Sequence, residues 1–312
     1  MKRALLVGIN DYPKNPLKGC VPDVLRMQEV LATHENGDEN FNCSLLISSE
    51  EVVTRPLLRS SIEKLFNHDK GTALLYFSGH GATTVSGTFL VTQDREKNDV
   101  GISLHEIITM ANDSKADEVV IILDCCYAGG AGNVISIKDR KAVLREGVSI
   151  LAAAGDKQYS YEINKKGVFT NIIYEAMKGA AADLRGKVTL SGMYYSADTI
   201  LNAWKQRPVF KSHVSSMISL RNCKPKIPLD ILRKLPAYFS GQKIGIRLSP
   251  NFLKEEHALS KMMEHLLHYN TNGLLMPVGA SSLQEAAKQG KECQLTALGQ
   301  FYKELASKNR LT

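Results

Sequence analysis

Two short apolar runs constrain the fold of this chain more than any other feature, because each ends abruptly in polar, glycine-bearing residues. Residues 74–77 (LLYF) lead into SGHG, and residues 119–123 (VVIIL) lead into DCCYAGG. Short runs without polar alternation are typical of strands buried on both faces, as in parallel sheets covered by helices. Ligands of such sheets bind beyond the carboxyl ends of the strands, so we expect an α/β fold with its site at these two exits.

The two exits carry a histidine and a pair of cysteines, which together favour nucleophilic catalysis. A thiol attacks as thiolate, and histidine is the side chain whose ordinary pKa suits it to take the thiol proton near neutral pH. His80 could meet Cys125 or Cys126 if the two strands are neighbours. Either motif alone is more often a strand-end turn or a buried thiol, but Cys126 follows His80 by 46 positions, a spacing that matches caspase-type enzymes.

Strand geometry separates the roles of the two cysteines. Successive side chains of a strand point to opposite faces, so Cys125 and Cys126 cannot both face His80. Asp124 and Cys126 share a face if the strand continues that far. One cysteine is therefore available for catalysis and the other for packing.

Six sequence blocks, in order, resemble the caspase and metacaspase clan, and their details are more similar to metacaspases and bacterial orthocaspases than to animal caspases. The blocks are KRALLVGIN, LKGCVPDVLRMQEVL, the two strand exits, SILAAAGDKQYSYE and GVFTNIIYEAM. The resemblance implies a cysteine endopeptidase with a three-layer αβα fold and a mostly parallel six-stranded sheet. It spans residues 1–222, with a large-subunit-like part (1–131), a linker (132–147) and a small-subunit-like part (148–222).

The resemblance also implies the roles of the site residues. The family pattern D-x-C-x-x-G makes Cys126 the nucleophile, with His80 as its base and Cys125 left to packing. The backbone amides of Gly81 and Cys126 would form an oxyanion hole, which stabilises the negative charge of the tetrahedral intermediate. We identify no third member of a triad and predict a dyad.

A pocket for a basic side chain follows from the same resemblance. Its four positions match Cys20, Asp23, Ser78 and Asp124, and two neighbouring carboxylates favour a guanidinium or ammonium between them. Taken alone, Asp23 would be read as an acidic residue in the first turn of a helix, stabilised by the helix dipole. With the family match, we expect cleavage after Arg or Lys.

The polar linker suggests autoprocessing, and the segment after the histidine argues against a metal. With a preference for Arg or Lys, the linker offers Lys138, Arg140, Lys141 and Arg145 as autocleavage sites, although the loop could equally be a helix with a charged face. Calcium needs six to eight oxygen ligands, whereas Asp94, Glu96 and Asp99 alternate with basic residues. We expect no metal in catalysis and do not expect activation by Ca²⁺.

Composition indicates a soluble cytoplasmic enzyme. The 312 residues suffice for one large domain and a small module, and no apolar run reaches the length of a membrane span. Six cysteines without framework spacing fit a reducing compartment. The net charge of +7 is spread along the chain, which favours a solvated basic surface over nucleic-acid binding, and we expect a monomer.

Residues 223–312 change character after NCKPKIP and form a separate module. Amphipathic and strand-like segments alternate in the order helix, strand, helix, strand, helix, with a Ser cap before LQEAAKQG and a Thr cap before ALGQFYKELAS. This order resembles a winged-helix-like α+β appendage. Without a helix rich in Arg, Lys and Asn, we prefer docking of a regulatory protein over DNA binding, and packing or surface roles over metal binding for its histidines.

Two functions from different classes remain open. The first is an endopeptidase that cleaves proteins or peptides after Arg or Lys, in a bacterial stress, cell-death or defence pathway. The second is a catalytically silent caspase-like scaffold that binds peptides or partners. Retention of His80, Cys126, Asp23 and Asp124 together favours the first.

Overall fold

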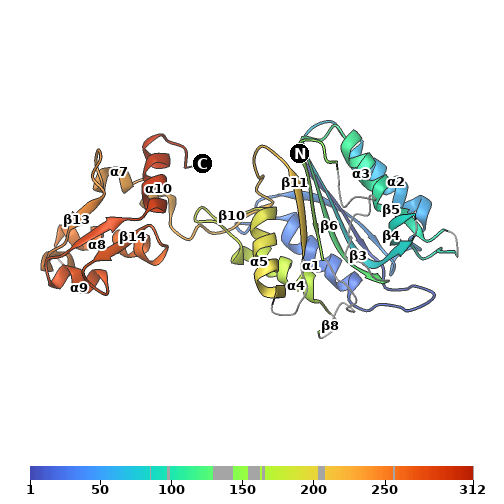
Figure 1. Cartoon of the computed structure of the whole chain (residues 1–312), viewed down its shortest axis with the longest axis horizontal. Coiled ribbons are helices and arrows are strands. Elements are labelled where there is room, and N and C mark those ends of the chain that lie inside the picture. The colour runs from blue at the N-terminus through green and yellow to red at the C-terminus, as the bar shows by residue number, and fades with distance from the viewer. Residues whose placement is uncertain are drawn as a thin grey trace. The chain divides into compact units, whose positions relative to one another are not determined.

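The computed structural model describes residues 1–84, 86–96, 99–128, 143–153, 162–163, 166–202, 208–255 and 257–311 (Figure 1). Their contacts divide the chain into two compact units. Unit 1 comprises Met1–Ala182 and Lys187–Cys223, and unit 2 comprises Asp183–Gly186 and Lys224–Thr312. Each unit has its own hydrophobic core, two clusters in unit 1 and one in unit 2.

Unit 1 is built on a sheet with the strand order β11-β7-β6-β3-β1-β2. All neighbours on this path are parallel except β11 and β7, which are antiparallel. A short antiparallel extension, β4 and β5, continues from the end of β3. The strands are β1 (Lys2–Gly8), β2 (Phe41–Ile47), β3 (Thr72–Thr84), β4 (Gly87–Val91), β5 (Gly101–Ser103), β6 (Glu118–Ala128), β7 (Val148–Ala152) and β11 (Val209–His213).

Helices cover both faces of this sheet, which explains why its central strands lack polar alternation. Alternate residues of β3 enter two different cores: Phe77 packs with α2 and α3, whereas Tyr76 packs with α1, α4 and α5 (Figure 1). The helices are α1 (Cys20–Ala32), α2 (Arg55–Phe66), α3 (Leu104–Asp113), α4 (Val168–Glu175) and α5 (Leu190–Asn202). The predicted three-layer α/β fold with a mostly parallel sheet is confirmed.

Local signals fix the starts of the helices. Thr54 precedes α2 and its side chain accepts a hydrogen bond from the Leu57 amide, while Ser103 caps α3 in the same way through Glu106. A single π-helical turn, Ala176–Ala180, follows α4, and the short strands of this region are β8 (Glu162–Ile163), β9 (Lys166–Gly167), β10 (Lys187–Val188) and β12 (Arg221–Asn222). In the part of the chain described, no helix combines the length and apolarity needed to cross a bilayer.

Unit 2 follows the predicted order of helix, strand, helix, strand, helix from α8 onward. Both predicted caps are present: Ser282 accepts from the Glu285 amide, and Thr296 accepts from the Gly299 amide. A three-stranded antiparallel sheet, β13-β15-β14, lies among the helices, and its assignment to the winged-helix class stays a prediction. The elements are α6 (Leu229–Leu232), α7 (Leu235–Tyr238), β13 (Gly245–Arg247), a 3-10 turn (Pro250–Leu253), α8 (Ala258–Thr271), β14 (Leu275–Val278), α9 (Leu283–Lys288), β15 (Glu292–Leu295) and α10 (Ala297–Ser307).

Candidate active site

The pairing of β3 with β6 brings the two strand exits together. The two strands are parallel neighbours, and their register places His80 opposite Cys126 and Ser78 opposite Asp124. Strand β6 continues to Ala128, so Cys126 lies inside the paired strand. The Cys126 side chain lies outside the described part of the structure, and its role as nucleophile stays a prediction.

The imidazole of His80 is held by a loop on one side. Its Nε2 lies 2.6 Å from the carbonyl oxygen of Asn15, in the loop that follows β1. A carbonyl oxygen only accepts, so this contact assigns the ring hydrogen to Nε2 and leaves Nδ1 as the basic nitrogen. Asn15 has a φ of 57°, in the left-handed region that Asn tolerates better than most residues.

Tyr12 ties the backbone of His80 to the core, a role that the sequence did not indicate. Its hydroxyl donates to the Val91 carbonyl at 3.1 Å and accepts from the His80 amide at 2.9 Å, and the two rings lie 4.5 Å apart between centroids. Burial raises the pKa of Tyr12 well above its ordinary value, so the hydroxyl keeps its proton. Tyr12 therefore positions the strand end that carries His80.

Cys125 and Gly81 lie on the two paired strands that carry the candidate site. Cys125 is 2 % exposed and lies in the core under α2 and α3, as expected of a packing residue. Gly81 is paired on both sides, with Tyr127 of β6 and Leu90 of β4. The participation of the Gly81 amide in an oxyanion hole stays a prediction.

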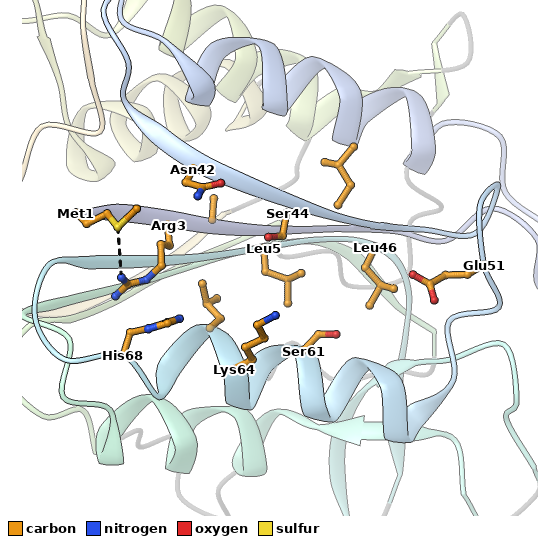
Figure 2. A pocket seen from close by; sticks show the side chains of 13 residues that line it. Met1, Arg3, Leu5, Asn42, Ser44, Leu46, Glu51, Ser61, Lys64 and His68 are labelled. Carbon is orange, nitrogen blue, oxygen red and sulfur yellow. Dashed lines mark hydrogen bonds between the residues drawn. The ribbon is translucent and has the colours of Figure 1, made fainter.

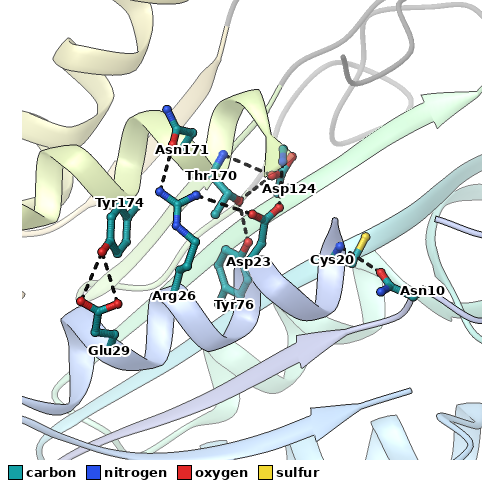
Figure 3. A network of polar contacts seen from close by, with 11 residues as sticks. Asn10, Cys20, Asp23, Arg26, Glu29, Tyr76, Asp124, Thr170, Asn171 and Tyr174 are labelled. Atoms are coloured by element: carbon teal, nitrogen blue, oxygen red, sulfur yellow. Dashed lines mark hydrogen bonds and ion pairs between the residues drawn. The ribbon is translucent and has the colours of Figure 1, made fainter. Parts of the chain in front are cut away.

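The two predicted pocket carboxylates converge at the start of α4 (Figure 3). Asp23, on α1, and Asp124, on β6, are 1 % and 8 % exposed. The Oδ2 of Asp23 accepts from the Gly167 amide at 3.1 Å, and the Oδ2 of Asp124 accepts from the amide and hydroxyl of Thr170 at 3.2 and 2.5 Å. A Cβ added to Gly167 would lie 2.7 Å from both Oδ2 atoms, so the two carboxylates border one small space.

Burial is the largest influence on the ionisation of Asp124. It raises the pKa of Asp124 above its ordinary value, and the hydrogen bonds from Thr170 oppose the rise only in part. The Thr170 hydroxyl also lies 2.6 Å from the Tyr76 hydroxyl, whose pKa is raised well above its ordinary value by burial and then by the charges of Asp124 and Asp23. Two carboxylates in such a setting favour a cation between them.

Arg26 lies within ion-pair distance of Asp23, but most of its contacts are with other residues. Its Nη1 lies 3.9 Å from Asp23 Oδ1, its Nη2 donates to Asn171 at 2.9 Å, and its centre lies 4.0 Å from the Tyr174 ring (Figure 3). The Tyr174 hydroxyl in turn donates to Glu29 at 3.2 Å. Arg26 therefore ties α1 to α4 and contacts Asp23 through a single long ion pair.

The other two predicted pocket residues lie beside the pair. Cys20 is the first residue of α1, is 7 % exposed, and donates its amide to Asn10 Oδ1 at 3.0 Å. Ser78 is buried within β3, opposite Asp124 of β6. Thr170 and Gly167 donate to the two carboxylates; they belong to the GVFTNIIYEAM block, to which the sequence analysis gave no site role.

The described residues among the autocleavage candidates and the acidic residues weighed for calcium binding make contacts within the fold. Lys138, Arg140 and Lys141 lie outside the described residues. The Arg145 amide donates to Asn112 at 3.0 Å and its Nη2 donates to the Ala116 carbonyl at 2.7 Å. Asp94 accepts from the Arg55 amide, and Asp99 pairs with the Arg55 guanidinium at 2.7 Å.

Comparison with known proteins identifies the family to which the chain belongs. A model of the caspase domain matches residues 1–218. Metacaspase-1 from Plasmodium falciparum is 28% identical over 193 residues, which are 52% of this chain and 31% of that protein. The chain thus spans about a third of the length of the curated relative it matches.

Solved structures give the same fold. Protein GSU0716 from Geobacter sulfurreducens aligns over 72% of this chain and 98% of its own, with a TM-score of 0.53 and 17% identity. Caspase-1 from Spodoptera frugiperda aligns over 71% and 91%, with a TM-score of 0.51 and 11% identity. At these identities the structures show the fold alone. Fold and strand-end site define a caspase-like α/β protein. The chain belongs to the caspase domain family, a family of cysteine peptidases.

Proposed function

We propose that the chain is a cysteine endopeptidase that cleaves protein or peptide substrates after Arg or Lys. The observation that carries this proposal is the β3–β6 register, which sets His80 opposite Cys126 and Ser78 opposite Asp124. One strand pair thus carries the residues that we propose as base, nucleophile and half of an acidic pocket. Proximity of this kind is what a covalent mechanism needs from the fold.

In the proposed reaction, His80 Nδ1 takes the thiol proton of Cys126, because Nε2 is directed at the Asn15 carbonyl. The thiolate attacks the carbonyl carbon of the scissile bond, and the amides of Gly81 and Cys126 stabilise the oxyanion. Collapse of the intermediate breaks the C–N bond, and His80 returns the proton to the leaving amine. Water, activated by His80, then hydrolyses the thioester and frees the thiol.

Specificity for a basic residue is proposed from the pair Asp23 and Asp124. Both carboxylates are nearly inaccessible, and both face the space beside Gly167. A guanidinium supplies several donors, and an ammonium three, so either can satisfy two carboxylates at once. A substrate aspartate would add a third negative charge to the same space and be repelled.

The setting of the enzyme is also a proposal. We propose a cytoplasmic, monomeric protein acting without a metal in a bacterial stress, cell-death or defence pathway, with unit 2 docking a regulatory protein. Autocleavage would require a cut within residues 138–145. Of these sites, Arg145 has its amide and guanidinium engaged in hydrogen bonds, which favours a cut nearer residues 138–141.

The test is cleavage of matched fluorogenic peptides that end in Arg, Lys or Asp before the dye, with and without Ca²⁺. We expect activity on Arg and Lys, abolished in Cys126→Ala and retained in Cys125→Ala. Preference for Asp would contradict the acidic pocket. Activity that survives in Cys126→Ala would contradict the nucleophile. No cleavage of any peptide, together with no labelling of Cys126 by a covalent thiol probe, would favour the scaffold function instead.

A further inference from the structure

A second site lies away from the strand exits, in a groove between the edge strand β2 and helix α2 (Figure 2). Its cavity volume is about 440 Å³, a size typical of ligand sites in proteins. The apolar floor consists of Leu5, Leu46 and Leu65. We call this feature the β2 groove; none of the proposed catalytic or pocket residues lines it.

Charge is distributed unevenly along the β2 groove. Arg3, Lys64 and His68 line one part of it, and Glu51 lies at the opposite end from Arg3 and His68 (Figure 2). In the described part of the chain, the guanidinium of Arg3 donates to two uncharged acceptors, Met1 Sδ at 3.9 Å and the Lys70 carbonyl at 3.3 Å. Among the residues that the structure describes, neither Arg3 nor Lys64 has a carboxylate within salt-bridge distance. The basic end is therefore complementary to an anion from outside the chain.

The edge of the sheet determines which anionic ligand fits. Strand β2 ends the strand order and pairs only with β1 in the described ranges, so its outer backbone groups face outward from the sheet. Asn42, Ser44 and Leu46 lie on one face of β2 and line the groove along the strand. An extended peptide that adds to a sheet edge gains main-chain hydrogen bonds and places alternate side chains in such a groove.

We infer that the β2 groove binds an extended peptide segment of a partner protein, added as a strand to β2. An acidic residue of the segment meets Arg3, Lys64 and His68, an apolar residue contacts the leucine floor, and a basic residue lies toward Glu51. At roughly 3.3 Å per residue, the stretch of β2 from Asn42 to Leu46 pairs with about five peptide residues. This site does not depend on the proposed peptidase activity.

The test selects random heptapeptides displayed on phage against the immobilised full chain carrying Cys126→Ala, which keeps the peptides intact. We expect enriched sequences to contain Asp or Glu beside apolar residues. The best synthetic peptide is then measured by fluorescence anisotropy. Lys64→Glu, at an exposed position, should weaken its binding about tenfold because attraction becomes repulsion. Ser61→Phe, which fills the groove, should weaken peptide binding as strongly. Lys261→Glu on α8 makes the same charge change outside the groove and is the control.

Hydrogen exchange distinguishes strand addition to β2 from other modes of peptide binding. Bound peptide should slow exchange of amides within Phe41–Ile47. Enriched peptides without acidic residues, or binding unaffected by both groove variants, would overturn the proposal. Equal competition by acetate or inorganic phosphate would indicate a small-anion site instead. Self-association of the chain, abolished by Lys64→Glu and insensitive to peptide, would identify a second copy as the occupant and would also overturn it.

Discussion

The two halves of the candidate site are built differently. Asp23 and Asp124 are almost inaccessible, and helices and strands of the core hold them through hydrogen bonds to Gly167 and Thr170. His80 is only half-buried, and a loop carbonyl orients its ring. This difference fits the proposed roles, because charge recognition needs a rigid, desolvated setting, whereas a general base needs access to both substrate and water.

The largest expected effect comes from removing the proposed base while leaving the acidic pair intact. His80→Ala should lower kcat/KM by about 10³-fold, the usual contribution of a general base. The loss should be equal for peptides with Arg and with a neutral residue before the cut, because the acidic pair is untouched. Steady-state kinetics on both peptides tests this. A loss confined to the Arg peptide would show that the two halves are not separable.

Asp23→Asn should impair recognition of a basic side chain and leave the proposed catalytic residues intact. The variant keeps the shape and one acceptor but removes a buried charge, so kcat/KM for Arg and Lys peptides should fall by about 10²-fold. Peptides with a neutral residue before the cut should change little. Equal losses on all peptides would assign Asp23 to the fold instead of the pocket, and thermal unfolding of the variant supplies that control.

Gly167→Ala sharpens the comparison by filling the space between the carboxylates. The φ of Gly167 is −63°, which any residue adopts, so the backbone should tolerate alanine. The added methyl would lie 2.7 Å from both Oδ2 atoms and should cost about tenfold in kcat/KM for Arg peptides, through steric overlap. Unchanged kinetics on Arg peptides would place the basic side chain elsewhere.

The smallest effect concerns stability. Burial raises the pKa of Asp124, so its contribution to stability is present at low pH and is lost as pH rises through that raised value. Asn carries no charge to bury and can still accept from Thr170. Asp124→Asn should therefore have an equal or higher Tm than wild type at pH 7, with the difference shrinking toward pH 4. Calorimetry across this range checks the sign, and a Tm difference that grows on acidification would contradict it.

The sequence predicted the sheet and the strand exits because those features are local. Buried strands need apolar residues on both faces, and the helix caps at Ser282 and Thr296 are set within a single turn. Tyr12 and Asn15 escaped prediction because they reach His80 across 68 and 65 positions. No periodic pattern in the sequence indicates a contact between residues so far apart. Thr170 stood in a recognised block, but its hydroxyl contacts Asp124 only once α4 packs on β6.

The hydrogen bonds at the start of α4 have a thermodynamic consequence. Asp23 Oδ2 accepts from the Gly167 amide, so a cation that takes the same lone pair would compete with this bond and would link ligand binding to the local order at the start of α4. In the proposed pocket, a guanidinium that displaces these bonds should speed hydrogen exchange of the Gly167 amide, and that of Thr170 if Asp124 reorients. These two amide protons would then report occupancy of the proposed pocket, even in a variant that cannot cleave.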